Sequence, residues 1–235
     1  MKTWAWCTFC GYCLLISSTT NSLHASEESL YDFLWLDPDK SVYVLQKKLY
    51  QKAKKFSLGG SFINSFGEEF MDTYGLDIKA DYFFKEEWGV EVFYTKYSNS
   101  KNDNYRNVDV ALDGVPFVRR VNQAVGAMVL WSPFYGKVNT FNRIYYFDWQ
   151  FGLGLASLAT ESNKNSVGTS VDNYDDKQNF VALAYKTDFR FHLSRKSYLS
   201  IGVRNFNYQA EGPTQRSQKK WRDHWDLLIG YGYKF

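Results

Sequence analysis

Two histidines, His192 and His224, offer the most direct acid–base chemistry in the chain. His224 stands between Asp223 and Asp226, and a histidine held by carboxylates can serve as a general base beside a serine nucleophile. The sequence shows no serine in a nucleophile-elbow context, no metal-spaced cluster and no phosphate-binding loop. We therefore favour the interpretation that both histidines fill a polar interior. His224 remains the weak catalytic candidate, and neither a cofactor nor a metal site is predicted.

The three cysteines share one apolar stretch near the N-terminus: Cys7, Cys10 and Cys13. Cys10 and Cys13 have the spacing of a redox or metal pair. However, the stretch follows Lys2, and small residues ending at Ala25 follow it, as in a secretory signal peptide. A buried N-terminal helix is the alternative. The pattern predicts a cleaved signal peptide over residues 1–25 and an exported chain without disulfides.

Composition narrows the class of protein. The chain has 235 residues, with 28 Lys and Arg against 25 Asp and Glu, so no strong charge favours nucleic acid. Aromatic residues make up 19%, which argues against disorder. The mean hydropathy is −0.43, and no stretch after the N-terminus holds about 18 uncharged apolar residues, which argues against a helical membrane protein.

Hydrophobic residues alternate with a period of two over residues 179–193. Val181, Leu183 and Phe189 share one face, while Lys186 and Arg190 share the other. A helix, with a period of 3.6, does not sort residues in this way. Similar patterns predict eight strands in all, near residues 56–64, 73–84, 88–97, 119–131, 143–157, 179–193, 197–208 and 220–235.

The predicted strands suit a membrane. Most reach the ~9–11 residues that a tilted membrane-spanning strand needs. Their apolar faces end in aromatic residues of the kind that gather at the two membrane–water interfaces: Tyr74, Phe84, Tyr94, Trp131, Tyr145, Phe147, Trp149, Trp225, Tyr231 and Tyr233. A soluble lipocalin-like barrel is disfavoured because charges stand in the middle of the second face. We predict an all-β, eight-stranded antiparallel outer-membrane barrel over residues 56–235.

Connector lengths alternate along the predicted barrel. The links over 98–118, 158–178 and 209–220 are long and polar, whereas those over 85–87 and 194–196 are tight turns. Long loops outside and short turns inside are typical of outer-membrane barrels. The terminal aromatic Phe235 then ends the last strand on the periplasmic side, where it is predicted to serve as the signal for the barrel-assembly machinery.

The inward faces of the predicted strands carry equal numbers of opposite charges. Eight strands enclose a space just wide enough for side chains, and buried charges need partners. We therefore predict a lumen plugged by an ion-pair network of twelve residues: Asp77, Lys79, Asp81, Glu91, Asp148, Lys186, Asp188, Arg190, Arg204, Arg222, Asp226 and Lys234.

Three blocks of sequence resemble a known family. They are residues 74–91, which begin Tyr-Gly-Leu-Asp-Ile-Lys, residues 131–142, which begin Trp-Ser-Pro-Phe-Tyr-Gly-Lys, and residues 42–50. Together they resemble the outer membrane β-barrel domain family found mainly in Myxococcus- and Bdellovibrio-like bacteria. The resemblance spans roughly residues 40–235. It implies the fold and an outer-membrane location in a Gram-negative cell envelope, but no catalytic residues.

Two regions are not explained by a simple barrel. Residues 26–55, predicted to be periplasmic, place Val42, Leu45, Leu49 and Ala53 on one helical face with lysines around them, although 42–44 equally suits a short strand. This segment is interpreted as a lead-in whose lysines lie at lipid headgroups, or as a plug or partner-binding helix. Link 132–142 is predicted to be a shaped turn and a possible docking site for a periplasmic partner through Pro133, Tyr135, Gly136, Lys137 and Asn139.

The sequence therefore predicts an exported barrel with a structural or interaction role in the cell envelope. Its expected partners are outer-membrane lipid, the barrel-assembly machinery and a periplasmic or envelope protein, with no nucleic acid. A small-solute channel is the second interpretation. A lipid-A-modifying enzyme that uses His224 is the third.

Overall fold

The structure is a computed structural model that describes residues 48–235 apart from 113, 141–142, 168–173, 175 and 213–218. The predicted signal peptide and residues 26–47 of the predicted N-terminal segment lie outside the described residues. Within the described residues, no helix is both long and apolar enough to cross a membrane.

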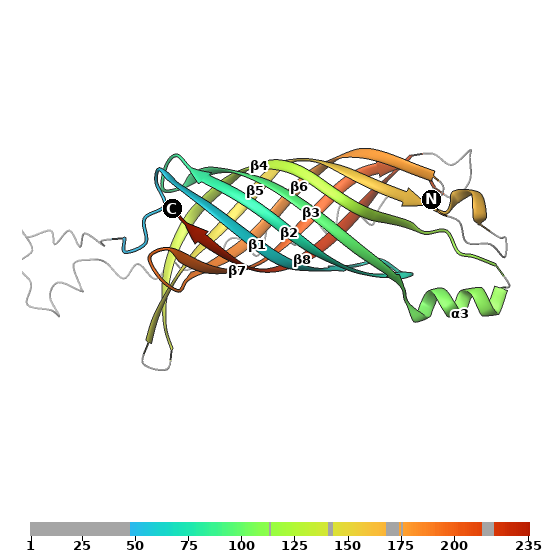
Figure 1. The fold of residues 1–235 in the computed structure, drawn as a ribbon, viewed down its shortest axis with the longest axis horizontal. Helices are drawn as coiled ribbons and strands as arrows, with labels where there is room; N and C mark the ends of the chain where they lie inside the picture. The colour runs from blue at the N-terminus through green and yellow to red at the C-terminus, as the bar shows by residue number, and fades with distance from the viewer. Residues whose placement is uncertain (1–47, 113, 141–142, 168–173, 175, 213–218) are drawn as a thin grey trace, which may run out of the picture. The chain divides into compact units, whose positions relative to one another are not determined.

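Eight antiparallel strands form a closed barrel in sequence order, with β1 paired to β8 (Figure 1). The strands are β1 (Lys55–Phe66), β2 (Met71–Phe83), β3 (Trp88–Lys101), β4 (Arg119–Thr140), β5 (Arg143–Ser162), β6 (Asp176–His192), β7 (Ser197–Ala210) and β8 (Lys220–Lys234). The predicted fold class is confirmed. Closure pairs each strand on both sides, so no free sheet edge remains around the barrel itself.

Alternation decides which side chains point inward. On β6, Lys186 and Arg190 are buried, whereas Val181 is 74% exposed and Leu183 is 45% exposed. The same reversal holds on the other strands, and the predicted aromatic residues Tyr74, Trp131 and Tyr231 all stand on the exposed face. This arrangement, with an apolar exterior around a charged interior, is the reverse of that in a soluble barrel and suits a lipid environment.

Strands β4 and β5 run further than the sequence predicts. Residues 132–140, predicted to form a shaped turn, belong to β4 and pair with β5 up to Thr140 opposite Arg143. The register shifts between Trp131 and Phe134, so a bulge accommodates Pro133, which cannot donate a ladder hydrogen bond. The prediction of a turn was wrong because a bulge lets proline continue a strand. Figure 1 shows this hairpin extending past its neighbours at the end where Phe235 lies.

The opposite end of the barrel carries the longer connections. Helix α3 (Asp103–Leu112) follows β3, and the short helix η1 (Lys164–Ser166) follows β5 (Figure 1). Tyr105 of α3 packs with Met71, Val115 and Val118 in a small apolar cluster. The strands β1 and β2 are joined more tightly through Gly67, whose φ of 92° suits glycine. The two ends of the barrel therefore differ as the connector lengths predict.

Candidate functional site: the charged interior of the barrel

The structure places the predicted ion-pair residues on the inner face of the barrel. Eleven of the twelve side chains are buried, and Arg222, near the helix-bearing end, is partly exposed. Apolar residues share the interior with them, including Ile63, Phe93, Met128 and Phe206. The lumen is thus a packed core in which charges are embedded, and it is less uniformly ionic than the sequence predicts.

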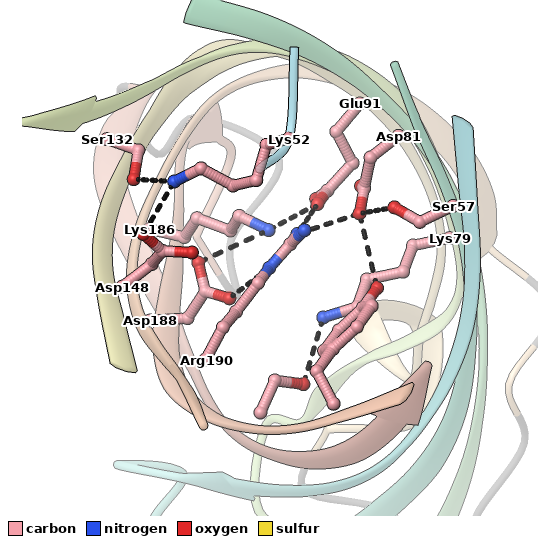
Figure 2. Close-up of polar contacts among 12 residues, drawn as sticks. Lys52, Ser57, Lys79, Asp81, Glu91, Ser132, Asp148, Lys186, Asp188 and Arg190 are labelled. Carbon is pink, nitrogen blue, oxygen red and sulfur yellow. Dashed lines mark hydrogen bonds and ion pairs between the residues drawn. The ribbon is translucent and has the colours of Figure 1, made fainter. Parts of the chain in front are cut away.

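Arg190 stands at the centre of the first ionic layer (Figure 2). Its guanidinium Nη2 lies 2.8 Å from Asp81 Oδ2, and its Nε lies 3.4 Å from Asp188 Oδ2. Lys186 pairs with Glu91 and lies 3.7 Å from Asp188. Three carboxylates from different strands thereby meet two cations, and the buried Lys79 ammonium supplies the third positive charge of the layer.

Hydroxyl groups and the Lys79 ammonium complete the rest of this layer. The Ser57 hydroxyl donates to Asp81 over 3.1 Å, and the Lys79 ammonium donates to the Ser200 hydroxyl over 3.3 Å. The Tyr198 ring lies over Gly232, where an added Cβ would come within 2.2 Å of the ring. The glycine therefore makes room for an aromatic ring that fills the lumen beside Arg190, whose guanidinium carbon is 4.9 Å from the ring centroid.

Arg204 organises a second layer nearer the helix-bearing end. Its Nη1 lies 2.9 Å from Asp77 and its Nη2 lies 3.0 Å from Asp226. The guanidinium carbon also lies 4.6 Å from the Phe93 ring centroid and 4.8 Å from that of Phe206. A planar guanidinium can pair at its edge and stack on its faces at once, which lysine cannot do.

His224 belongs to this second layer. Its Nε2 lies 3.2 Å from Asp226 and its Nδ1 lies 3.0 Å from Glu68, so both ring nitrogens face carboxylates. The nearby Ser65 hydroxyl donates to Asp226, over 2.6 Å. Only 2% of His224 is exposed. This geometry places His224 as an interior polar residue, and no serine hydroxyl of the described chain is hydrogen-bonded to its ring.

At the opposite mouth, Lys52 enters the lumen from the segment that precedes β1 (Figure 2). Its ammonium lies 2.8 Å from Asp148 Oδ1 and donates to the Ser132 hydroxyl over 2.6 Å. Burial lowers the pKa of Lys52 to about 8, and the attraction of Asp148 offsets part of this shift. The lead-in interpretation predicts that this lysine reaches outward to lipid headgroups. Instead, Lys52 points inward and closes the mouth.

An aromatic stack surrounds this ion pair. The Tyr50 ring lies on the His192 ring at a centroid distance of 4.7 Å. His192 Nε2 is 2.7 Å from Asp148, and Lys234 Nζ is 3.0 Å from His192 Nδ1. His192 therefore fills the lumen at this rim, as the sequence predicts for a polar filler.

Glu86, in the turn between β2 and β3, holds the same segment in place. Its Oε1 accepts hydrogen bonds from the backbone N–H groups of Lys52 and Ala53, and its Oε2 pairs with Lys48 over 3.2 Å. Partial burial works to raise the pKa of Glu86, but the Ala53 N–H and Lys48 outweigh it, so this pKa lies below its ordinary value. We call residues 48–53 the mouth strap. The described part of the predicted helical face, Leu49 and Ala53, is not helical.

The five predicted docking residues lie on the extended part of β4. Pro133 stands in the bulge, and Tyr135 pairs with Asp148 in register. Gly136 and Tyr135 are partly exposed, and Lys137 and Asn139 are exposed. The Lys48 ammonium lies 4.9 Å from the Tyr135 ring centroid, which links this hairpin to the mouth strap.

Sequence reasoning missed several residues that complete the interior, among them Lys52, Glu68, Glu86, Tyr97 and Arg119. The Tyr97 hydroxyl donates to Asp226 over 2.6 Å. Tyr97 and Arg119 lie in predicted strands, so strand alternation could have indicated their inward positions. Lys52, Glu68 and Glu86 lie outside the predicted strands, where alternation does not indicate direction.

An eight-stranded antiparallel barrel with an apolar exterior and a charged interior is a transmembrane barrel of the outer-membrane type. In structure, the chain is similar to the N-terminal β-barrel domain of Pseudomonas aeruginosa OprF, with 13% identity, 79% of this chain and 100% of that chain covered, and a TM-score of 0.48. It is also similar to P. aeruginosa OprG, with 17% identity, coverage of 79% and 98%, and a TM-score of 0.44. A third similar structure is Yersinia pestis Ail, with 13% identity, 78% of this chain and 99% of that chain covered, and a TM-score of 0.41.

No family model and no curated protein sequence matches the chain. The resemblance to the Myxococcus- and Bdellovibrio-type barrel family stays a prediction.

Proposed function

We propose that the chain is a non-conducting outer-membrane barrel with a structural or interaction role in the cell envelope. The observation that carries this proposal is the stack of paired groups across the lumen. Lys52 and Asp148 lie at one mouth, Arg190 lies in the middle, and Arg204 with its carboxylates lies beyond. Ions would have to displace buried, mutually paired charges to pass, and eight strands leave little space around them.

The exterior supports the proposed location. Leu76, Ile78 and Val92 are each more than half exposed, and continuous apolar surface of this kind is costly in water. Aromatic pairs such as Trp88 and Trp131 lie near the mouth strap end, where an interfacial girdle is expected. We place that end in the periplasm because it carries the short turns.

The position of Phe235 supports recognition by the barrel-assembly machinery. Phe235 is 64% exposed, and its N–H donates to the Phe56 carbonyl over 2.8 Å. Its ring therefore stands outside the barrel beside β1, at the seam that must close last if the barrel forms from sequential hairpins.

The extended hairpin supports an interaction role. Beyond Trp131, opposite Trp88, β4 has no described partner on its β3 side, so residues 134–140 present an open strand edge. Exposed edges of this kind pair with added strands. Lys137 and Arg143 are exposed, and residues 133–147 contain no acidic residue, so an extended acidic segment of a periplasmic or envelope protein is the proposed partner.

Planar-bilayer recording separates this proposal from the channel interpretation. The purified barrel, inserted into a bilayer at 1 M salt, is expected to give no stepwise conductance because its lumen is filled. A sixteen-stranded porin recorded in the same chamber serves as the positive control. Reproducible unitary steps from the wild-type protein would overturn the proposal and favour a small-solute channel.

A further inference from the structure

A cavity of about 330 Å³ opens at the end of the barrel that carries α3. The cavity is lined by the β1–β2 turn, by the start of β4, and by the parts of β7 and β8 nearest this end. Its volume lies at the lower end of the range for small-molecule sites. The cavity lies beyond the Arg204 layer, so it plays no part in closing the lumen.

Two arginines line this cavity and have no carboxylate partner among the described residues. Arg222 makes no ion pair or hydrogen bond with any described residue, and its guanidinium carbon lies 5.5 Å from the Phe117 ring centroid. Arg119 is 6% exposed and donates only to neutral acceptors, namely the Gln178 amide oxygen over 3.1 Å, the Thr160 hydroxyl and the Glu211 carbonyl.

The unsatisfied atoms point to a missing acceptor. The Nε atoms of both Arg119 and Arg222 are buried and have no hydrogen-bond partner within the described part of the chain. Every other buried arginine of the lumen, Arg190 and Arg204, meets carboxylates. Buried polar groups are normally satisfied, and an unpaired guanidinium costs more than a neutral group. This end of the barrel is therefore built to receive negative charge from outside.

The acidic residues at the rim do not supply that charge. Glu68 is held by His224 at 3.0 Å, and Asp223 accepts a hydrogen bond from the Asn207 amide over 2.5 Å. Asp223 and Glu69 are both exposed to solvent, where screening weakens their fields. Two guanidiniums with buried, unpaired Nε atoms therefore face the cavity against two solvent-screened carboxylates.

We propose that this cavity binds a phosphate monoester of a sugar-sized molecule. A phosphate monoester carries about −1.5 to −2 charge at neutral pH and three acceptor oxygens, which match two guanidiniums. Phe117 and Tyr208 line the same cavity and offer ring faces for the non-ionic part of the ligand. The phosphate belongs either to a soluble sugar phosphate or to the phosphorylated headgroup of a neighbouring glycolipid.

Calorimetric titration of the purified barrel in detergent with glucose 1-phosphate tests the soluble source, with glucose as the uncharged control. We expect saturable binding of the phosphate and none of glucose. Arg222→Gln and Arg119→Gln should each weaken binding by about tenfold or more, since each removes a charge-assisted pair. Glu69→Gln should tighten binding about two- to threefold because it removes one of the opposing charges at the rim.

Nanodiscs that contain either phosphorylated lipid A or its dephosphorylated form test the membrane source. If the barrel retains only the phosphorylated form, and Arg222→Gln abolishes this retention, the bound phosphate belongs to a glycolipid. Arg195→Gln, in the exposed turn at the other end, is the matched control and should change neither measurement. Each variant is checked for the heat-modifiable gel mobility of a folded barrel.

The proposal would be overturned if the barrel bound neither glucose 1-phosphate nor phosphorylated lipid A. It would also be overturned if glucose bound as well as glucose 1-phosphate, or if folded Arg222→Gln bound the phosphate as well as wild type does. The outcome is independent of the conductance test, because a closed lumen leaves this cavity intact.

Discussion

Individual charges in this barrel are stabilised by partners that come from distant parts of the chain. Arg204 on β7 meets Asp77 on β2 and Asp226 on β8, and the Thr95 hydroxyl donates to Asp77 over 2.6 Å. Each group in this layer therefore depends on the others, and the removal of one leaves uncompensated charge in a low-dielectric interior.

Arg204→Met should lower the free energy of unfolding by about 3–5 kcal/mol, because it leaves Asp77 and Asp226 buried without their guanidinium. Urea unfolding in micelles, followed by tryptophan fluorescence, measures the change. Arg195→Met, in an exposed turn, should stay within about 0.5 kcal/mol of wild type. If both variants unfold alike, the pairing seen at Arg204 contributes little.

Because of Lys52, the free energy of unfolding of the barrel should depend on pH in the alkaline range. Its folded pKa of about 8 lies below the ordinary value of 10.5, because the ammonium is buried. Between these two values the unfolded chain binds more protons, so this group makes stability increase as pH rises from about 8 to about 10.5. Below pH 8 the lysine is protonated in both states and its contribution is constant.

Comparison of wild type with Lys52→Met by urea unfolding at pH 7.5 and pH 10 isolates this effect. The stability of wild type relative to the variant should be greater at pH 10. Parallel pH profiles would show that Lys52 does not titrate as its burial predicts.

Among the elements, the β4–β5 hairpin is set apart from the barrel wall. Strand β3 begins at Trp88, opposite Trp131, and β6 ends at His192, opposite Tyr146. Beyond these points the two strands pair only with each other among the described residues, and Phe134, Val138 and Ile144 are about half exposed. A two-stranded ribbon alone is marginal in water, which is consistent with a partner that adds a strand.

Deletion of residues 137–145 should leave the barrel folded, with a free energy of unfolding within about 1 kcal/mol of wild type, because this tip pairs with no other described strand. In cells, a photo-crosslinking residue at position 138 should yield one discrete protein adduct. The same residue at position 181, on the lipid-facing side of β6, is the control and should yield none. Loss of folding on deletion, or equal adducts at both sites, would contradict the docking role.

At the scale of the whole molecule, the two ends of the barrel have different surfaces. One end carries the mouth strap, the tight turns and Phe235, and the other carries α3 and the arginine-lined cavity. This asymmetry predicts a single orientation in the membrane, with the strap end in the periplasm.

Single cysteines test this orientation, because all three native cysteines lie within residues 1–25. A membrane-impermeant maleimide added to intact cells should label Val110→Cys, at an 86% exposed position on α3, and should spare Arg195→Cys. After permeabilisation both should react. Labelling of Arg195→Cys alone in intact cells would reverse the orientation and place the cavity in the periplasm.

Much of the architecture could be predicted from local pattern. Alternation over residues such as Val181, Lys186 and Arg190 determines which side chains face lipid and which face the lumen, because successive residues of a strand point in opposite directions. The same pattern assigned twelve charges to the inner face, and eleven of these side chains are buried, but it did not include Arg119. It could not reveal that β4 continues through Pro133, because a bulge depends on how the neighbouring strand pairs.

The sequence by itself determined the number of strands, the lipid-facing side and the balance of buried charge. Only the tertiary structure decided which charges meet, that Lys52 enters the mouth, and that Arg119 and Arg222 share a cavity in which no described carboxylate pairs with them. The physical reason is that closure and strand register bring residues more than a hundred positions apart within a few ångströms, as for Arg204 and Asp77. Alternation within a strand contains no information about that stagger.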